Sequence, residues 1–115
     1  LVSITASCAY VDPSDAIIIG SIGGIISGST IVLLEKIKID DVVSAIPVHL
    51  ASGIWGTIAV ALFGNFEMMG VEKTRLEQLL IQLIGIGSIG SFCFFGSYII
   101  FKTINSRARS KKEKW

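Results

Sequence analysis

The stretch from Asp40 to Phe63 reads DDVVSAIPVHLASGIWGTIAVALF and decides what kind of protein this is. After its two aspartates it is almost wholly apolar, and it carries His49, the single histidine of the chain. Its length matches a helix that crosses the roughly 30 Å hydrocarbon core of a bilayer at about 1.5 Å per residue. We therefore expect a membrane-spanning helix over residues 41–63.

The surroundings of His49 suggest where its side chain points. On a regular helix its face is shared by small residues, namely Ala45, Gly53, Gly56 and Ala59. Such a face lets neighbouring helices approach closely, so we expect it to point into a helix bundle and not toward lipid. His49 lies about eight residues into the span, roughly 12 Å of helix rise. A role in a pathway or in sensing is favoured over a packed structural histidine, because ionisable groups at that depth are costly.

The whole chain shares this apolar character. Of its 115 residues, 51% are hydrophobic and only 17% are charged, and the mean hydropathy is +0.71. The apolar residues come in long runs, so we predict an all-α membrane protein, a polytopic helix bundle with helices over about 1–11, 13–36, 41–63 and 79–104. A basic cytoplasmic tail or linker follows over 105–115. Because the chain opens within an apolar pattern without an initiator methionine, we expect it to be a piece of a longer protein.

Local signals mark the ends and contacts of these helices. Asp12 and Pro13 predict a helix start, with the aspartate at the N-cap and the proline at the first helical position. Within that helix Gly20, Gly24 and Gly28 repeat at intervals of four, a pattern typical of close packing between membrane helices.

The start of the His49 span carries a proline and two carboxylates. Asp40 and Asp41 can cap this helix, where its dipole favours negative charge, and capping is the simplest role for both. Pro47 has no N–H for the carbonyl of Val43, so we expect a local bend or an unpaired carbonyl on the bundle side.

The distribution of basic residues sets the orientation. The loop at 64–78 contains two of the ten, Lys73 and Arg75. The other eight lie on the opposite side, in the turn after the 13–36 helix and from residue 102 onward: Lys36, Lys38, Lys102, Arg107, Arg109, Lys111, Lys112 and Lys114. The positive-inside rule places that side, including the C-terminus, in the cytoplasm. We expect the protein to lie in the plasma or inner membrane of the cell.

Other function classes find little support. One histidine and two distant cysteines make no credible metal site, and the glycines are not followed by the Lys-Ser/Thr pair of a phosphate loop. We expect no cofactor, no catalytic residues and no nucleic-acid partner, and hence no enzyme. The basic tail fixes topology or contacts anionic membrane lipid.

Three runs carry a resemblance to a known family: LVSITASCAYVDPSDAIIIGSIGG, LLEKIKIDDVVSAIPVHLASGIWGTIAVALF and QLLIQLIGIGSIGS. In this order they resemble the last part of the ammonium transporter (Amt/Rh) family, from the end of span eight through span eleven. The resemblance implies an eleven-span fold, a homotrimer, and a pore for ammonium or ammonia in each subunit. The remaining N-terminal helices of the same protein would supply the rest of that pore.

The resemblance also implies roles for individual residues. His49 matches the second of two stacked pore histidines, and Ala45 would line the same passage one turn away. Asp40 and Asp41 match an acidic pair at the cytoplasmic end, and with Gly53 they would shape the region near the pore.

Two departures from the family pattern flank the histidine. Leu50 stands where glycine is usual, and Pro47 stands close to His49 while the usual proline after the Asp-Asp pair is missing. The tail lacks the family's Gly-Leu-Asp segment. An ammonium sensor coupled to a cytoplasmic signalling partner or fused domain, with little or no conduction, is therefore the main alternative. A small membrane protein whose glycine faces serve assembly only is a third.

Overall fold

The structure, a computed structural model, describes the backbone of residues 1–112 and the side chains of residues 1–106. In chain order it contains α1 (Val2–Thr5), α2 (Pro13–Lys36), the π-helix η1 (Ile46–Ala51), α3 (Ser52–Phe63), α4 (Phe66–Met69) and α5 (Arg75–Lys112). Three stretches are long and apolar enough to cross a membrane: Pro13–Lys36, Ile46–Phe63 and Arg75–Ser106. The all-helical, polytopic membrane fold expected from the sequence is confirmed. The last three residues of the expected tail lie outside the described residues.

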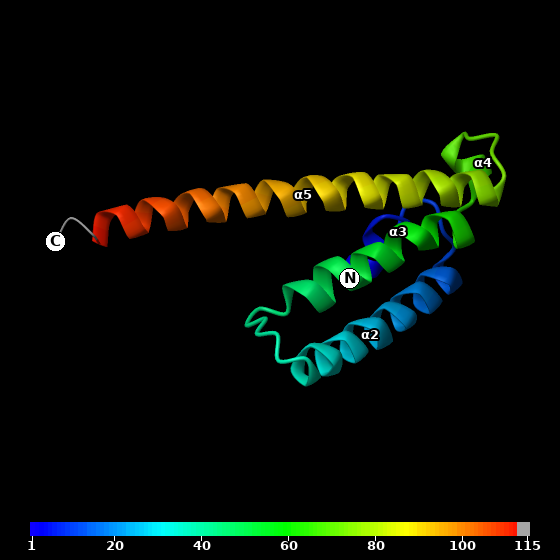
Figure 1. Cartoon of the computed structure of the whole chain (residues 1–115). Coiled ribbons are helices and arrows are strands. Elements are labelled where there is room, and N and C mark those ends of the chain that lie inside the picture. The colour runs from blue at the N-terminus through cyan, green and yellow to red at the C-terminus, as the bar shows by residue number, and fades with distance from the viewer. Residues whose placement is uncertain (113–115) are drawn as a thin grey trace. The chain divides into compact units, whose positions relative to one another are not determined.

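The chain divides into two units, Leu1–Leu83 and Ile84 onward. In the first unit, α2 and α3 run side by side in opposite directions (Figure 1). η1 continues α3 at its start and packs against α2, while α1 packs against both α2 and α3. The second unit consists of the remainder of α5, which is helical without a break through Lys112. The pairing of α2 with η1 and α3 positions the residues of interest.

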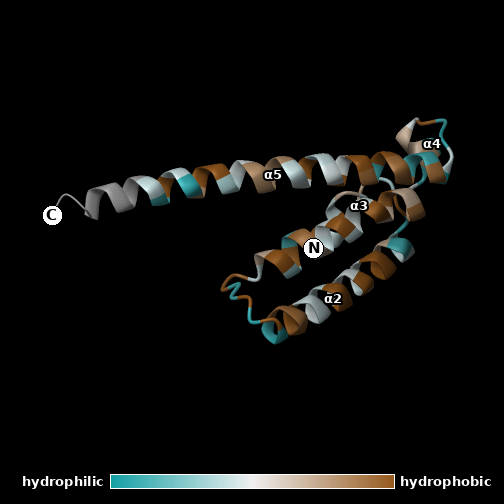
Figure 2. Ribbon diagram, in the orientation of Figure 1, coloured by the Kyte–Doolittle hydropathy of each residue, from teal (hydrophilic) through white to brown (hydrophobic). Residues whose placement is uncertain are grey.

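The interior of the first unit is small. Its buried apolar side chains are Ile19, Leu34, Pro47, Ala59, Val60 and Ala61. Figure 2 shows apolar residues in brown along α2, α3 and α5, and polar residues in teal in the turns that connect them. Most of the large apolar side chains on these helices are exposed on the described chain. Such a surface is unfavourable in water but is stable in contact with lipid or further protein.

The first two helices differ in part from the sequence prediction. The stretch expected to be helical over 1–11 forms only the short α1, and turns follow through Ala9. Asp12 occupies the N-cap position of α2 with extended backbone, but its side chain makes no capping hydrogen bond. Pro13 opens the helix as expected, since its missing N–H lies among donors that have no intrahelical partner anyway.

α2 ends in a tight reversal at Lys38. The backbone N–H of Ile39 donates to the carbonyl of Leu34 at 3.0 Å, and that of Lys38 donates to Glu35 at 3.1 Å. This pair of bonds is the Schellman motif, in which one residue takes the left-handed conformation, and Lys38 does so with φ of 57°. The motif satisfies the last carbonyls of the helix and turns the chain back toward η1.

α5 begins four residues earlier than the predicted span, at Arg75 and not at residue 79. The reason is a capping box: the Glu77 carboxylate accepts hydrogen bonds from the Thr74 N–H at 2.9 Å and from its hydroxyl at 3.0 Å. The helix also continues through residues 105–112, which the sequence analysis assigned to a tail. The loop at 64–78 is likewise partly helical, because Asn65 caps α4 and Gly70 ends it with φ of 65°.

The glycines that pack closely within this chain are not those of the repeat. A Cβ added to Gly20, Gly24 or Gly28 would meet no atom within 4 Å, so the expected packing face is open in the described residues. Ser3 of α1 lies instead against Gly23 of α2 and Gly56 of α3, both of which are buried. The close contact between α1 and α2 is therefore at Gly23, one residue before Gly24 of the repeat.

Candidate functional site

The start of the His49 helix is held by one carboxylate. The two oxygens of Asp41 accept hydrogen bonds from the backbone N–H groups of Ala45 at 2.9 Å and Ile46 at 2.7 Å. These N–H groups have no partner within the helix, so Asp41 serves as its cap. Asp40 is exposed and its side chain makes no hydrogen bond to the described residues. Of the two aspartates proposed for capping, Asp41 does so.

The helix begins at Ile46, five residues later than expected. Ser44 has φ of 53°, in the left-handed region, which interrupts any helix that would begin at Asp41. Pro47 consequently lies in the first turn and not in the helix interior. A proline there removes no helical hydrogen bond, so the predicted defect at Val43 does not arise.

The first turn is a π-helix, and this changes which residues share a face. Each hydrogen bond in such a turn spans five residues instead of four, which rotates the preceding residues by about the 100° that one residue occupies. Gly56 and Ala59, beyond the π-helix, are buried as expected. Ala45 and His49, before or within it, are exposed. The single face predicted from regular α-helical spacing is therefore split.

His49 lies three residues after the helix begins, so the roughly 12 Å of preceding helix is not present. Its ring makes no hydrogen bond to the residues that the structure describes. Leu50 beside it is 54% exposed. Gly53 is half-buried, and a Cβ there would lie 3.8 Å from Val2. Ala45, His49 and Leu50 are thus all exposed on this chain.

Two hydrogen-bonding side chains on α3 were missed by sequence reasoning. The Ser52 hydroxyl lies 3.2 Å from the carbonyl oxygen of Gly23, and the Trp55 indole N–H donates to the carbonyl of Ile19 at 3.0 Å. Both acceptors belong to α2 and lie one turn apart. Polar side chains three residues apart in an apolar span are a signal for such bonds between membrane helices.

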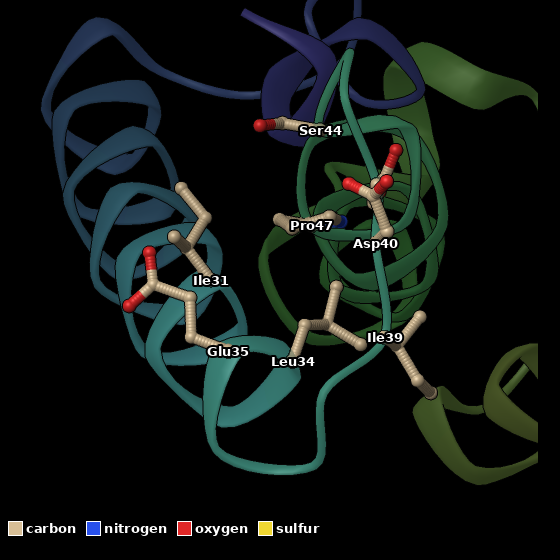
Figure 3. Close-up of a pocket in the computed structure, with 8 residues that line it drawn as sticks. Ile31, Leu34, Glu35, Ile39, Asp40, Ser44 and Pro47 are labelled. Atoms are coloured by element: carbon tan, nitrogen blue, oxygen red, sulfur yellow. The ribbon is translucent and has the colours of Figure 1, made fainter.

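Asp41 and Pro47 also line a pocket of about 220 Å³ between the end of α2 and the start of η1. Figure 3 shows the Pro47 ring directed toward α2, with Glu35 and Asp40 at the margin and Ile31 and Leu34 from α2. Asp40 and Pro47 line the same pocket. His49 does not line this pocket.

Comparison with known proteins assigns the chain to a family. Residues 1–114 match the model of the Ammonium Transporter Family. Ammonium transporter Amt2 of Archaeoglobus fulgidus is 39% identical over 98% of this chain and 27% of that protein. Ammonium transporter 3 of Dictyostelium discoideum is 50% identical over 91% and 27%, and the ammonium transporter of Bacillus subtilis is 32% identical over 91% and 28%. The chain spans roughly a quarter of the length of these curated relatives.

Proposed function

Because this chain belongs to the ammonium transporter family, we propose that it forms the C-terminal part of a membrane channel or transporter that moves ammonium or ammonia. The match over residues 1–114 carries this proposal, since it includes the whole His49 span. The names of the relatives agree with this substrate. The protein is proposed to act in a plasma or inner membrane, with a cytoplasmic C-terminus, as a homotrimer in contact with lipid.

His49 and Ala45 are proposed to line the passage. Their exposure on this chain, at the start of an apolar span, supports the assignment because other helices of the same protein can then complete a pore around them. A neutral imidazole presents one N–H donor and one acceptor nitrogen. Such a ring can accept a hydrogen bond from ammonia or relay a proton along the passage.

Flux measurements on the complete protein in proteoliposomes test the proposal. His49→Ala is expected to lower ammonium-driven flux by at least about 100-fold, the lower end of what a positioned proton-transfer group contributes. Thr103→Val is a control, since among the described residues the Thr103 hydroxyl bonds only to the carbonyl of Ile99 within α5. Unchanged flux in His49→Ala, with protein folded and inserted, would refute a pore role for the imidazole.

Sensing with little conduction is the second candidate, and one observation favours it. Helix α5 is unbroken from Arg75 to Lys112, so it could carry a shift at its membrane end to a cytoplasmic partner or fused domain. Leu50, exposed beside His49, could narrow the passage. Ammonium binding without flux, together with flux on Leu50→Gly, would favour sensing over conduction.

A further inference from the structure

We propose that Ser52 is a positioning residue for His49: its hydroxyl maintains the π-helical turn that determines where the imidazole points. The inference rests on the proposed role of His49 in conduction. It adds a residue that acts on His49 through the backbone of η1.

The contacts of Ser52 join two helices and the π-helix at one point. Its hydroxyl lies 3.2 Å from the carbonyl oxygen of Gly23 in α2 and 3.2 Å from that of Pro47 in η1. Its backbone N–H is directed to the carbonyls of His49 and Pro47, three and five residues earlier. Ser52 is 5% exposed and Pro47 is fully buried. The single hydroxyl proton is shared between the carbonyls of Gly23 and Pro47, and the Pro47 carbonyl also receives the Ser52 N–H.

This arrangement favours the π-helical turn over an α-helical one. In an α-helix the Pro47 carbonyl would accept a hydrogen bond from the N–H of Ala51, four residues later. The Ser52 hydroxyl adds a second, shared hydrogen bond to the Pro47 carbonyl. This bond requires Pro47 and Ser52 to be close together, as they are in the π-helical turn beside α2. Removing the hydroxyl leaves the i+5 bond alone to compete with the usual i+4 bond, and π-helices are rare because that competition normally favours the α-helix.

The consequence for His49 is a change in direction. In a regular α-helix His49 would lie on the side of Ser52 and Gly56, three and seven residues later, and that side is buried against α1 and α2. The π-helix turns His49 away from it by up to about 100°. The exposed histidine and the buried Pro47 and Ser52 in the same short segment reflect this rotation.

The experiment measures flux and the reactivity of the His49 ring on the complete protein in proteoliposomes. Ser52→Ala is expected to lower ammonium-driven flux about 10-fold and to change the rate of His49 modification by diethylpyrocarbonate several-fold, as read by mass spectrometry. Ser52→Thr keeps the hydroxyl and is expected to stay within about twofold of the parent in both. The unfolding equilibrium should shift only about threefold, as for an average hydrogen bond between membrane helices.

Two controls separate positioning from ordinary structural support. Trp55→Phe removes the other side-chain bond to α2, and Thr57→Val removes a hydroxyl that bonds to Gly53 within α3 at 2.9 Å. Neither side chain makes a hydrogen bond to η1, so both variants should leave His49 reactivity unchanged even where stability falls. Equal changes in His49 reactivity for Trp55→Phe and Ser52→Ala would overturn the inference.

The remaining outcomes distinguish this inference from the proposed function. Parent-like flux and reactivity in Ser52→Ala, with flux lost in His49→Ala, would overturn the positioning role and keep the pore role. Parent-like flux in His49→Ala would refute the pore role itself. If Ser52→Ala does not fold, Ser52→Cys decides, because its S–H is a weak donor: an intermediate change in His49 reactivity supports the inference, and none overturns it.

Discussion

The contact between α1 and α3 gives a sharp prediction at Gly56. A Cβ placed on this residue would lie 2.5 Å from the carbonyl oxygen and 2.9 Å from the carbonyl carbon of Ser3. These are backbone atoms, which cannot swing aside as the end of a flexible side chain can. Gly56→Ala must therefore push α1 away from α3 or bend one of them.

The size of the effect follows from a comparison with Gly53→Ala. Both substitutions lie in α3 and gain the same helix propensity, about 0.5–1 kcal/mol, which cancels in the difference. A Cβ at Gly53 makes an ordinary contact at 3.8 Å with Val2. Overpacking typically costs about 1–3 kcal/mol. The unfolding equilibrium of the Gly56 variant should thus be less favourable than that of the Gly53 variant by roughly 5- to 150-fold.

Reversible unfolding of the complete protein in mixed micelles, followed by tryptophan fluorescence, measures this difference. Ser3→Gly offers no relief because the atoms in question belong to the backbone, so the double variant Ser3→Gly, Gly56→Ala should remain as unstable as Gly56→Ala. Equal stability of Gly56→Ala and Gly53→Ala would refute the reasoning and show that α1 does not approach α3 at this point.

Two further predictions concern helix ends. Asp41→Ala is expected to cost about 0.5–2 kcal/mol of stability, because its carboxylate caps the His49 helix, whereas Asp40→Ala should change stability by less than about 0.5 kcal/mol; urea titrations in micelles compare the two. Arg75 donates to the carbonyls of Ala61 and Leu62 at the end of α3 and lies over the ring of Phe66. Arg75→Gln should therefore speed amide hydrogen exchange in the last turn of α3 several-fold, whereas Lys73→Gln should leave it unchanged. Equal exchange rates in the two variants would contradict the guanidinium bonds.

The helices with strong local signals could be predicted from the sequence. The range expected for the second helix, 13–36, is the range of α2, since Asp12-Pro13 and the polar turn after Lys36 are signals that act within a few residues. The start of α5 lies four residues before the predicted start, although the sequence signal for it is equally local. The Thr74-to-Glu77 spacing is that of a capping box, and it was included in a polar loop.

The His49 region could not be predicted in the same way. No pattern of apolar residues distinguishes a left-handed Ser44 or a π-helical turn from a regular helix. The single face expected from a constant 100° per residue is therefore divided at the π-helix, with Ala45 and His49 exposed and Gly56 and Ala59 buried on this chain. The roles of Ala45, Leu50 and Gly53 remain predictions, because they depend on protein segments beyond this chain.

The meeting point of Ser3, Gly23, Ser52 and Gly56 bears on how this segment can vary. All four side chains are small, and they are held between helices whose outer surfaces carry large apolar groups. At these four positions the size of a new side chain should limit which substitutions are accepted. On the outer apolar surfaces its polarity should be the limit. A saturation-mutagenesis map would then show only glycine accepted at Gly23 and Gly56, where any Cβ meets Ser3 within 2.5 Å, and only Ser or Thr fully active at Ser52.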